Sequence, residues 1–349
     1  MTKHLQNQII SYFLRQQTGK SSEVIDFLRE QDTDVADITI KRALSALAKD
    51  GQLRIEGQGP ATRYHLTARG RLTTDIDAAE YCAIEPDQRY GQNSFNFELF
   101  EQMPETIITE KELAELDEAT NKYAERLRNQ SDTAREKELE RYVIELSWKS
   151  SQIEGNTYTI LDTERLIRDG IEAAGHSKDE ATMILNHKTA FREILEKRND
   201  FKSLSRYNLE HVHTLLTADL GIATGFRSSL VGITGSRYLP LDNAYQIGEA
   251  VEALVEAVAR LQTGYEKALL TLLGVSYIQP FEDGNKRTAR LTANAILLAH
   301  GLAPLSYRSV DIEQYRNAVL AFYELNTLQP FKRIFIDQYK FAASNYAVR

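Results

Sequence analysis

The chain has 349 residues, of which 42% are hydrophobic, which is enough apolar material for a sizeable core and for more than one domain. Its single cysteine excludes an intramolecular disulfide framework and favours a reducing compartment. No apolar run reaches the roughly 18–20 residues that cross a bilayer, and the start lacks a signal-peptide core, so we expect a cytoplasmic protein with no membrane partner.

The formal charge of −8 is spread unevenly along the chain. Residues 1–71 hold 11 Lys and Arg residues against 8 Asp and Glu residues, a net charge of +3, which leaves −11 for the rest. A basic head on an acidic body is compatible with nucleic-acid contact by the head alone.

The first elements in chain order are three helices and a hairpin. Apolar residues recur at helical spacing in QIISYFLRQ, SSEVIDFLRE and ITIKRALSALAKDGQL, and the last of these ends at Gly51. LRIEGQGPATRYHLT alternates, turns and alternates again. This order resembles a winged helix-turn-helix over residues 1–71.

The winged-helix resemblance implies DNA as a partner of the head. The DNA-binding candidates are Lys41, Arg42 and Ser45, which would face the groove, and Arg63, which would contact phosphate from the wing. The alternative is a module for protein contact or dimerisation, with solvated basic residues and a homodimer as the outcome.

The rest of the chain is predicted to be mainly α. Residues 72–110 are interpreted as an extended linker that ends near the Met103–Pro104 step, and residues 111–349 have helical periodicity almost throughout. The exception is LVGITGSRYLP, residues 230–240, where β-type residues around Gly232 and Gly235 predict a hairpin inside the helical domain.

The segment IQPFEDGNKRTARL, residues 278–291, has the features of a phosphate site. The apolar helix before it should end at Gln279, because the residue before Pro280 is pushed out of helical geometry. A Gly284-Asn285 turn then starts a second helix, whose first N–H groups and positive dipole end attract anions.

Charged residues flank this helix start. Arg287 and Arg290 are three apart, so they point the same way and suit a polyphosphate. Asp283, just before the turn, is placed to hold Mg²⁺. The alternative is an ordinary helix cap with two surface arginines.

The same segment resembles the signature of the Fic family, His-x-Phe-x-(Asp/Glu)-Gly-Asn-Gly-Arg-x-x-Arg. The positions that match at identical spacing are Phe281, Asp283, Gly284, Asn285, Arg287 and Arg290. The resemblance implies an all-helical Fic domain over residues 111–349 with a β-hairpin flap for positioning the target. The flap would include Val231, Gly232, Ile233 and Thr234.

The family resemblance implies the transfer of AMP from ATP, with Mg²⁺, to a hydroxyl of a target protein. By this resemblance Asp283 would bind Mg²⁺ and Asn326 would contact the adenine. The phosphates would be bound by Gly284, Asn285, the backbone of Lys286, Arg287 and Arg290.

A second resemblance lies upstream, in SSQIEGN. Ser150, Glu154 and Gly155 resemble the family's inhibitory motif (Ser/Thr)-x-x-x-Glu-(Gly/Asn), on a helix near residues 143–156. The resemblance implies that Glu154 pairs with Arg290 and occupies the guanidinium that the γ-phosphate needs. The alternative is a helix C-terminus with a glycine stop.

Two positions depart from the family signature. Gln279 stands where the family has its catalytic histidine, and glutamine cannot accept a proton at ordinary pH. The chain is then a slow adenylyltransferase, a pseudoenzyme that acts as a DNA-binding regulator, or a histidine-to-glutamine variant of an active enzyme. Lys286 replaces a glycine and resembles the Doc branch, so phosphate transfer is a further alternative.

The histidines show no metal-ligand set, and Cys82 is interpreted as a packing residue.

Overall fold

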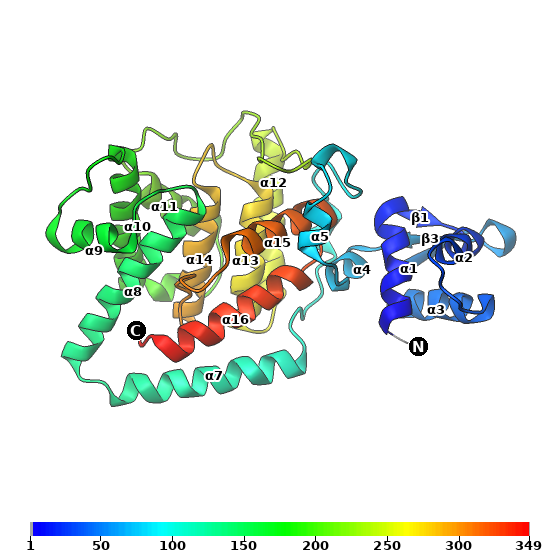
Figure 1. The fold of residues 1–349 in the computed structure, drawn as a ribbon, viewed down its shortest axis with the longest axis horizontal. Helices are drawn as coiled ribbons and strands as arrows, with labels where there is room; N and C mark the ends of the chain where they lie inside the picture. The colour runs from blue at the N-terminus through cyan, green and yellow to red at the C-terminus, as the bar shows by residue number, and fades with distance from the viewer. Residues whose placement is uncertain (1–2, 349) are drawn as a thin grey trace. The chain divides into compact units, whose positions relative to one another are not determined.

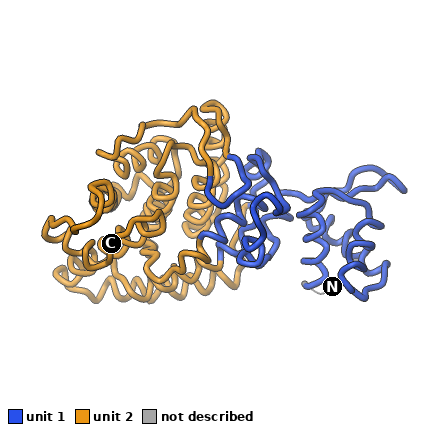
Figure 2. Tube along the Cα trace, turned by 45° about the horizontal axis from the view of Figure 1, so that its top comes forward, with its two compact units in different colours: residues 1–104, 233–239, 316–332 blue, residues 105–232, 240–315, 333–349 orange. Residues whose placement is uncertain are grey.

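The computed structural model describes residues 3–348, which divide into two compact units (Figure 2). Unit 1 comprises 1–104, 233–239 and 316–332, and unit 2 comprises 105–232, 240–315 and 333–349. Residues 1–2 and 349, at the ends of the predicted domains, lie outside the described residues. Among the described residues, no helix combines the length and the hydropathy needed to cross a membrane.

Unit 1 begins with three helices and a small antiparallel sheet. Their order is α1 (Lys3–Gln16), β1 (Thr18–Gly19), α2 (Ser21–Glu30), α3 (Asp37–Lys49), β2 (Leu53–Glu56), η1 (Gly59–Ala61) and β3 (Arg63–Leu66). The predicted hairpin is confirmed, because β2 pairs with β3 from Leu53↔Leu66 to Glu56↔Arg63. The short strand β1 was not predicted, and it extends the sheet in the order β1-β3-β2.

The core of this part forms from the helical faces that the sequence predicts. Ile40, Ala43, Leu44 and Leu47 of α3 are all buried. They share one hydrophobic cluster with residues of α1 and α2, and Tyr81 also belongs to this cluster.

Residues 72–110 are not the extended linker that was predicted. They contain the end of α4 (Ala68–Thr73), α5 (Ala78–Cys82), η2 (Pro86–Gln88) and α6 (Glu98–Glu101). Asp77 starts α5, because its side chain accepts hydrogen bonds from the first backbone N–H groups of the helix. Leu99 and Phe100 of α6 are almost fully buried. Capping and burial therefore give this segment local helical structure.

Unit 2 is built from helices. They are α7 (Glu110–Asn129), α8 (Asp132–Ile153), α9 (Ile160–Asp169), α10 (Lys178–Glu196), η3 (Arg198–Phe201), α11 (Arg206–Thr217), α12 (Ala244–Arg260), α13 (Gly264–Ile278) and α14 (Asn285–Ala299). Two further helices, α15 (Ile312–Leu325) and α16 (Gln329–Asn345), have residues in both units.

The centre of unit 2 is the pair α13 and α14, which run side by side (Figure 1). Nearly every residue of α13 is buried, as expected for a helix that is apolar all round. Gly274 lets α12 approach closely, because a Cβ atom there would lie 2.4 Å from Cδ1 of Leu254. This packing fixes the end of α13 and the start of α14, between which the predicted phosphate segment lies.

The segment 230–240 does not form the predicted hairpin, since no residue in it belongs to a strand. It contains one turn, in which Ser236 N donates to Ile233 O over 3.1 Å. Other backbone donors of the segment bond elsewhere: Arg237 N donates to the carboxylate of Glu324, and Leu239 N donates to Asn93 O. The N–H groups that a ladder would need are therefore used by other parts of unit 1.

Candidate functional site

The loop from Gln279 to Gly284 connects α13 to α14. Helix α13 ends at Ile278, and Gln279 has a left-handed backbone with φ 52° and ψ 58°, which confirms the predicted helix end. The side chain of Gln279 is 8% exposed, and its Nε2 donates to Ser276 O over 2.6 Å. Arg227, which also belongs to unit 2, donates from Nε to Gln279 O over 2.7 Å. The position is firmly held, but it carries no titratable group.

Side chains within the loop hold its shape. Asn285 exchanges two hydrogen bonds with the backbone of Phe281, each of 2.8 Å. Gly284 has a φ of 78°, and a Cβ atom there would lie 3.2 Å from Cγ2 of Thr217. No side chain among the described residues caps α14. The first N–H groups of α14 thus follow a rigid turn with no side-chain oxygen upon them, as an anion site requires.

His213 of α11 contacts the loop at Phe281 and at Asp283. Its ring stacks on Phe281, with the ring centroids 3.7 Å apart. Burial lowers the pKa of His213, and the neutral ring donates through Nε2 to Asp283 O over 3.0 Å. Sequence reasoning missed this role, because His213 lies 70 residues before Asp283 and belongs to no motif.

The two arginines of α14 are almost completely buried. Arg287 is 2% exposed, and its Nη2 bonds Asp283 Oδ2 over 3.0 Å. Its Nη1 is also buried, and no atom of residues 3–348 accepts a hydrogen bond from it. Arg290 is 1% exposed and bonds Ser150, from Nε to Oγ over 3.0 Å and from Nη2 to O over 2.8 Å. These are not the surface arginines of an ordinary helix cap.

Glu154 caps the C-terminal end of α8 and completes the environment of Arg290. Its Oε1 lies 2.9 Å from Nη1 of Arg290, and its Oε2 lies 3.7 Å from Nζ of Lys286. Burial opposes its charge, but the attraction of Arg290 and then Lys286 outweighs burial and lowers the pKa of Glu154. Gly155, with a φ of 98°, ends the helix at this point.

A second histidine, His187 of α10, fixes the hydroxyl of Ser150. Burial, with a further contribution from the two arginines, lowers the pKa of His187 to about 3, so the ring is neutral. Its Nδ1 lies 2.9 Å from Met183 O and must donate there. Its Nε2 therefore accepts the Ser150 hydroxyl proton over 2.9 Å, which leaves the Oγ lone pairs to Arg290. This relay joins two residues that the sequence predicted with one that it did not.

The remaining predicted residues lie in other surroundings. Asn326, in unit 1, is fully buried and presents no polar atom at the surface. Its Nδ2 donates to Phe322 O, and its Oδ1 accepts a hydrogen bond from Asn96. The side chain of Asn326 therefore caps the end of α15. Val231 and Gly232 fall in unit 2, and Ile233 and Thr234 fall in unit 1. Of the DNA-binding candidates, Lys41, Arg42 and Ser45 are exposed on α3, and Arg63 is partly exposed on β3.

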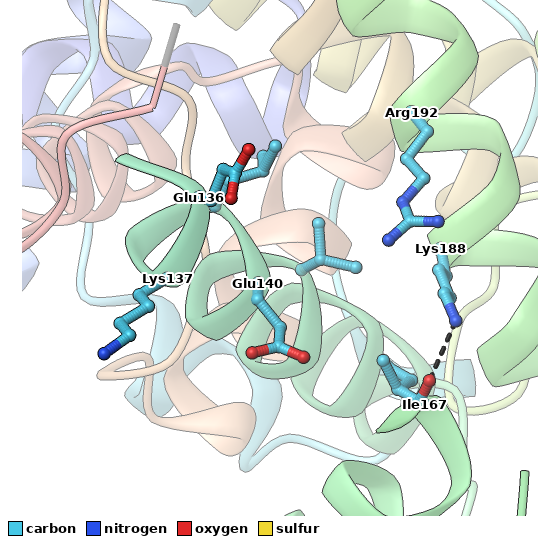
Figure 3. Close-up of a pocket in the computed structure, with 8 residues that line it drawn as sticks. Glu136, Lys137, Glu140, Ile167, Lys188 and Arg192 are labelled. Carbon is cyan, nitrogen blue, oxygen red and sulfur yellow. Dashed lines mark hydrogen bonds between the residues drawn. The ribbon is translucent and has the colours of Figure 1, made fainter. Parts of the chain in front are cut away.

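A separate pocket of about 410 Å³ lies on α8, α9 and α10 (Figure 3). Two of its charged side chains already have partners. Lys188 Nζ donates to Ile167 O over 2.8 Å, and Glu140 forms an ion pair of 3.1 Å with Arg168. None of its lining residues belongs to the predicted site. Among the described residues there is no group of three or more His, Cys, Asp or Glu side chains that would hold a metal.

The fold and this loop define a mainly helical protein with a candidate anion site at a buried helix N-terminus. Residues 203–297, which include the loop, match the Fic/DOC family. The chain therefore contains a Fic/DOC family domain.

Curated relatives are similar to about half of this chain. The chain is 28% identical to the protein adenylyltransferase fic-1 of Caenorhabditis elegans over 188 residues, which are 52% of this chain and 36% of that protein. It is 29% identical to the protein adenylyltransferase Fic of Nematostella vectensis over 178 residues, which are 48% of this chain and 40% of that protein. The chain thus spans well under half the length of these relatives.

Solved structures share the fold. A Fic-domain-containing signaling protein from Bacteroides thetaiotaomicron matches with a TM-score of 0.57 and 21% identity, covering 66% of this chain and 94% of that one. Fic-1 from C. elegans matches with a TM-score of 0.55 and 22% identity, covering 68% of this chain and 70% of that one. At these identities the likeness concerns the fold alone.

Proposed function

We propose that this chain is a Fic-type protein adenylyltransferase, which transfers AMP from ATP to a protein hydroxyl and is restrained by its own Glu154. One observation carries the proposal: two buried guanidiniums lie one turn inside an uncapped helix, one with an unpaired Nη1 and the other occupied by a carboxylate. Buried cations need anionic partners, and a triphosphate supplies them. The names of the curated relatives support AMP transfer as the reaction.

The roles within the site follow from position. The backbone N–H groups of Asn285 and Lys286, after the Gly284 turn, would hold the α-phosphate region. Arg287 and Arg290 would hold the β- and γ-phosphates. One carboxylate fits a Mg²⁺ ion that takes its other oxygens from phosphates and water, and Asp283 is 68% exposed and meets this requirement. Bound Mg²⁺ would neutralise phosphate charge.

Glu154 restrains the site by competition. Its carboxylate takes the Nη1 of Arg290 that a γ-phosphate needs, and Ser150 takes Nε and Nη2. A nucleotide that binds productively must displace Glu154 from Arg290. Its binding is then opposed by the lost attraction between these two partly desolvated charges. Inhibition of this kind weakens productive ATP binding without altering the phosphate loop itself.

Gln279 limits the rate of transfer. A glutamine orients a target hydroxyl but takes no proton from it, and losing a general base costs roughly 10²–10⁴ in rate. Transfer at phosphorus relies mainly on positioning and charge stabilisation, so a slow activity survives. If it does not, the chain is a nucleotide-binding pseudoenzyme.

Restoring the base tests the proposal. The double variant Gln279→His/Glu154→Gly is incubated with Mg²⁺ and ATP labelled at either the α- or the γ-phosphate. Transfer of the α-label to protein is expected, and Glu154→Gly alone should be slower by about 10² or more. No transfer of either label to the chain itself or to lysate proteins would overturn the proposed activity.

The same experiment distinguishes the phosphotransferase alternative. Lys286 Nζ approaches the carboxylate that also pairs with Arg290, which places a third cation beside the proposed phosphate site. If ATP bound in the reverse orientation, as the Doc resemblance implies, the γ-label and not the α-label would move to protein.

A second proposed function concerns the head, where α3 exposes Lys41, Arg42 and Ser45. We propose that residues 3–70 are a winged helix that binds duplex DNA through this face. The affinity should then fall steeply with salt, and Arg42→Ala should weaken it, whereas the exposed Lys137→Ala in α8 should not. A lack of salt-sensitive binding to random-sequence duplexes would contradict this function.

A further inference from the structure

Unit 1 contains a buried carboxylate that the proposed chemistry does not use. Glu324, on α15, is 0% exposed. Its Oε2 accepts from the hydroxyl of Tyr81 over 2.7 Å, and its Oε1 accepts from Ser236 Oγ over 2.7 Å and from Arg237 N over 3.3 Å. A buried charge persists only when it is paired and hydrogen-bonded, and here all three donors converge on one side chain.

Arg89 provides the opposite charge. Its guanidinium is 5% exposed and lies 3.3 Å from Glu324 Oε1. The other donors are also used: Nη1 bonds Gly235 O, Nε bonds Ile84 O and Nη2 bonds Cys82 O, each over 2.8 Å. In return, the side chain of Arg237 donates to Arg89 O. The ion pair therefore holds three consecutive residues, 235–237, through both backbone and side chains.

This segment has few other means of keeping its conformation. Residues 230–240 form no strand, and Thr234 and Gly235 are exposed. Fixing the backbone of an irregular residue costs conformational entropy. The Arg89–Glu324 pair, together with the buried ring of Tyr238, supplies contacts that offset this cost. The residues just before the anchor, Ile233 and Thr234, belong to the predicted flap.

We propose that Arg89 and Glu324 are positioning residues, which fix residues 233–237 so that this segment can orient the protein substrate. The inference rests on the proposed adenylyltransferase function and adds two determinants of target docking that lie outside the nucleotide site. It also gives residues 81–92 a role beyond connecting domains. Because both side chains are buried within unit 1 and neither belongs to the proposed phosphate site, their loss should impair transfer to protein and leave ATP binding unchanged.

The test uses the full chain with Gln279→His/Glu154→Gly as the parent. Glu324→Gln removes the charge, and Ser236→Ala, which keeps the ion pair, serves as the milder variant in case Glu324→Gln fails to fold. Ser309→Ala, which removes a serine–glutamine hydrogen bond in unit 2, is the matched control. Three quantities are measured: Mg-ATP affinity, α-label transfer to protein, and hydrogen exchange of the amides of residues 233–239.

The anchor variants should bind ATP within about twofold of the parent, transfer label roughly tenfold more slowly, and exchange faster at residues 233–239. Unchanged transfer, or a parallel loss of ATP affinity, would overturn the positioning role. If the parent transfers no label, the proposed function is overturned, and so is the role of residues 233–237 in orienting the protein substrate. Hydrogen exchange would still decide whether the anchor exists, because unchanged exchange in both variants refutes it.

Discussion

At the scale of single residues, the site is organised around Arg290. Burial disfavours its charge, but Glu154 and then Tyr315 outweigh burial and raise the pKa of Arg290. Besides Tyr315, Arg290 bonds Ser150 and Glu154 of the predicted inhibitory motif. A guanidinium held in this way is already positioned for an anion, and under the proposed function the identity of that anion determines whether the site is restrained or active.

Lys286 is expected to act as a second restraint on Glu154. The ion pair spans 3.7 Å and Lys286 is 36% exposed, so it is worth less than about 1 kcal/mol and weakens with salt. Lys286→Gly should therefore tighten Mg-ATP binding by at most about fivefold. Titration calorimetry in the Glu154→Gly background provides the control, where this gain should disappear. An equal gain in both backgrounds would contradict a role through Glu154.

His187 gives the folded state a pH dependence. Its pKa is about 3, below the ordinary 6.5, so between these values the unfolded chain binds a proton that the folded chain does not. The free energy of unfolding should therefore fall as the pH drops from about 6.5 towards 3, by up to about 1.4 kcal/mol per pH unit.

Urea unfolding at pH 7 and pH 5 measures this effect. His187→Gln should lose less stability than the parent chain between the two values, by up to ~2 kcal/mol. The exposed His4 is the matched control, and His4→Gln should behave like the parent. Identical pH dependence in all three proteins would contradict the neutral, buried state of His187.

At the scale of elements, two helix ends meet: the C-terminal end of α8 and the N-terminal end of α14. Helix α8 ends at Ile153, so Glu154 leaves it as the capping residue, and Gly155 turns the chain away with a left-handed backbone. Helix α14 begins without a side-chain cap. The negative side chain at the end of α8 therefore lies near the positive end of α14, which is favourable for α14.

Gly155→Ala should loosen this arrangement. A Cβ atom would meet nothing within 4 Å, so the cost comes from the φ of 98° and should be about 1–2 kcal/mol. Thermal unfolding should show this loss, and Mg-ATP should bind more tightly because Glu154 is less well held. Gly248, inside α12, is the matched control, since Gly248→Ala should stabilise the helix. A neutral or stabilising Gly155→Ala would contradict the strained cap.

Helix ends and faces could be predicted because they depend on neighbouring residues. Pro280 fixed the expected end of α13, and apolar spacing predicted the buried face of α3. The prediction of a hairpin at 230–240 was wrong, because Arg237 N and Leu239 N donate to Glu324 and Asn93 rather than to an opposing strand. A local sequence pattern does not predict hydrogen-bond partners that lie so far away in the sequence.

The same limit applies within the site. Asp283, Arg287 and Arg290 share one short motif, so the sequence revealed them together. His187 and His213 lie on other helices and are recognisable only from contacts, with Ser150 and Asp283 respectively. Their pKa values depend on burial, which a single sequence does not report.

At the scale of the whole molecule, the chain returns twice to unit 1 after leaving it. Residues 233–239 and 316–332 join the N-terminal 104 residues, and Glu324 lies in the second of these segments (Figure 2). A division of the chain into three consecutive segments, as the sequence predicted, does not describe units that are built from separate parts of the chain. The division places Ile233 and Thr234, two residues of the predicted flap, in the same unit as residues 3–70.

The central claim, that the start of α14 holds the triphosphate of ATP, is tested most directly by calorimetric titration with Mg-ATP. Glu154→Gly should bind at least about tenfold more tightly than the unaltered chain, because it frees a charged contact worth roughly 1.5–3 kcal/mol. Adding Arg287→Ala to Glu154→Gly should remove most of this affinity. Equal binding by all three proteins, or binding by none of them, would contradict the account.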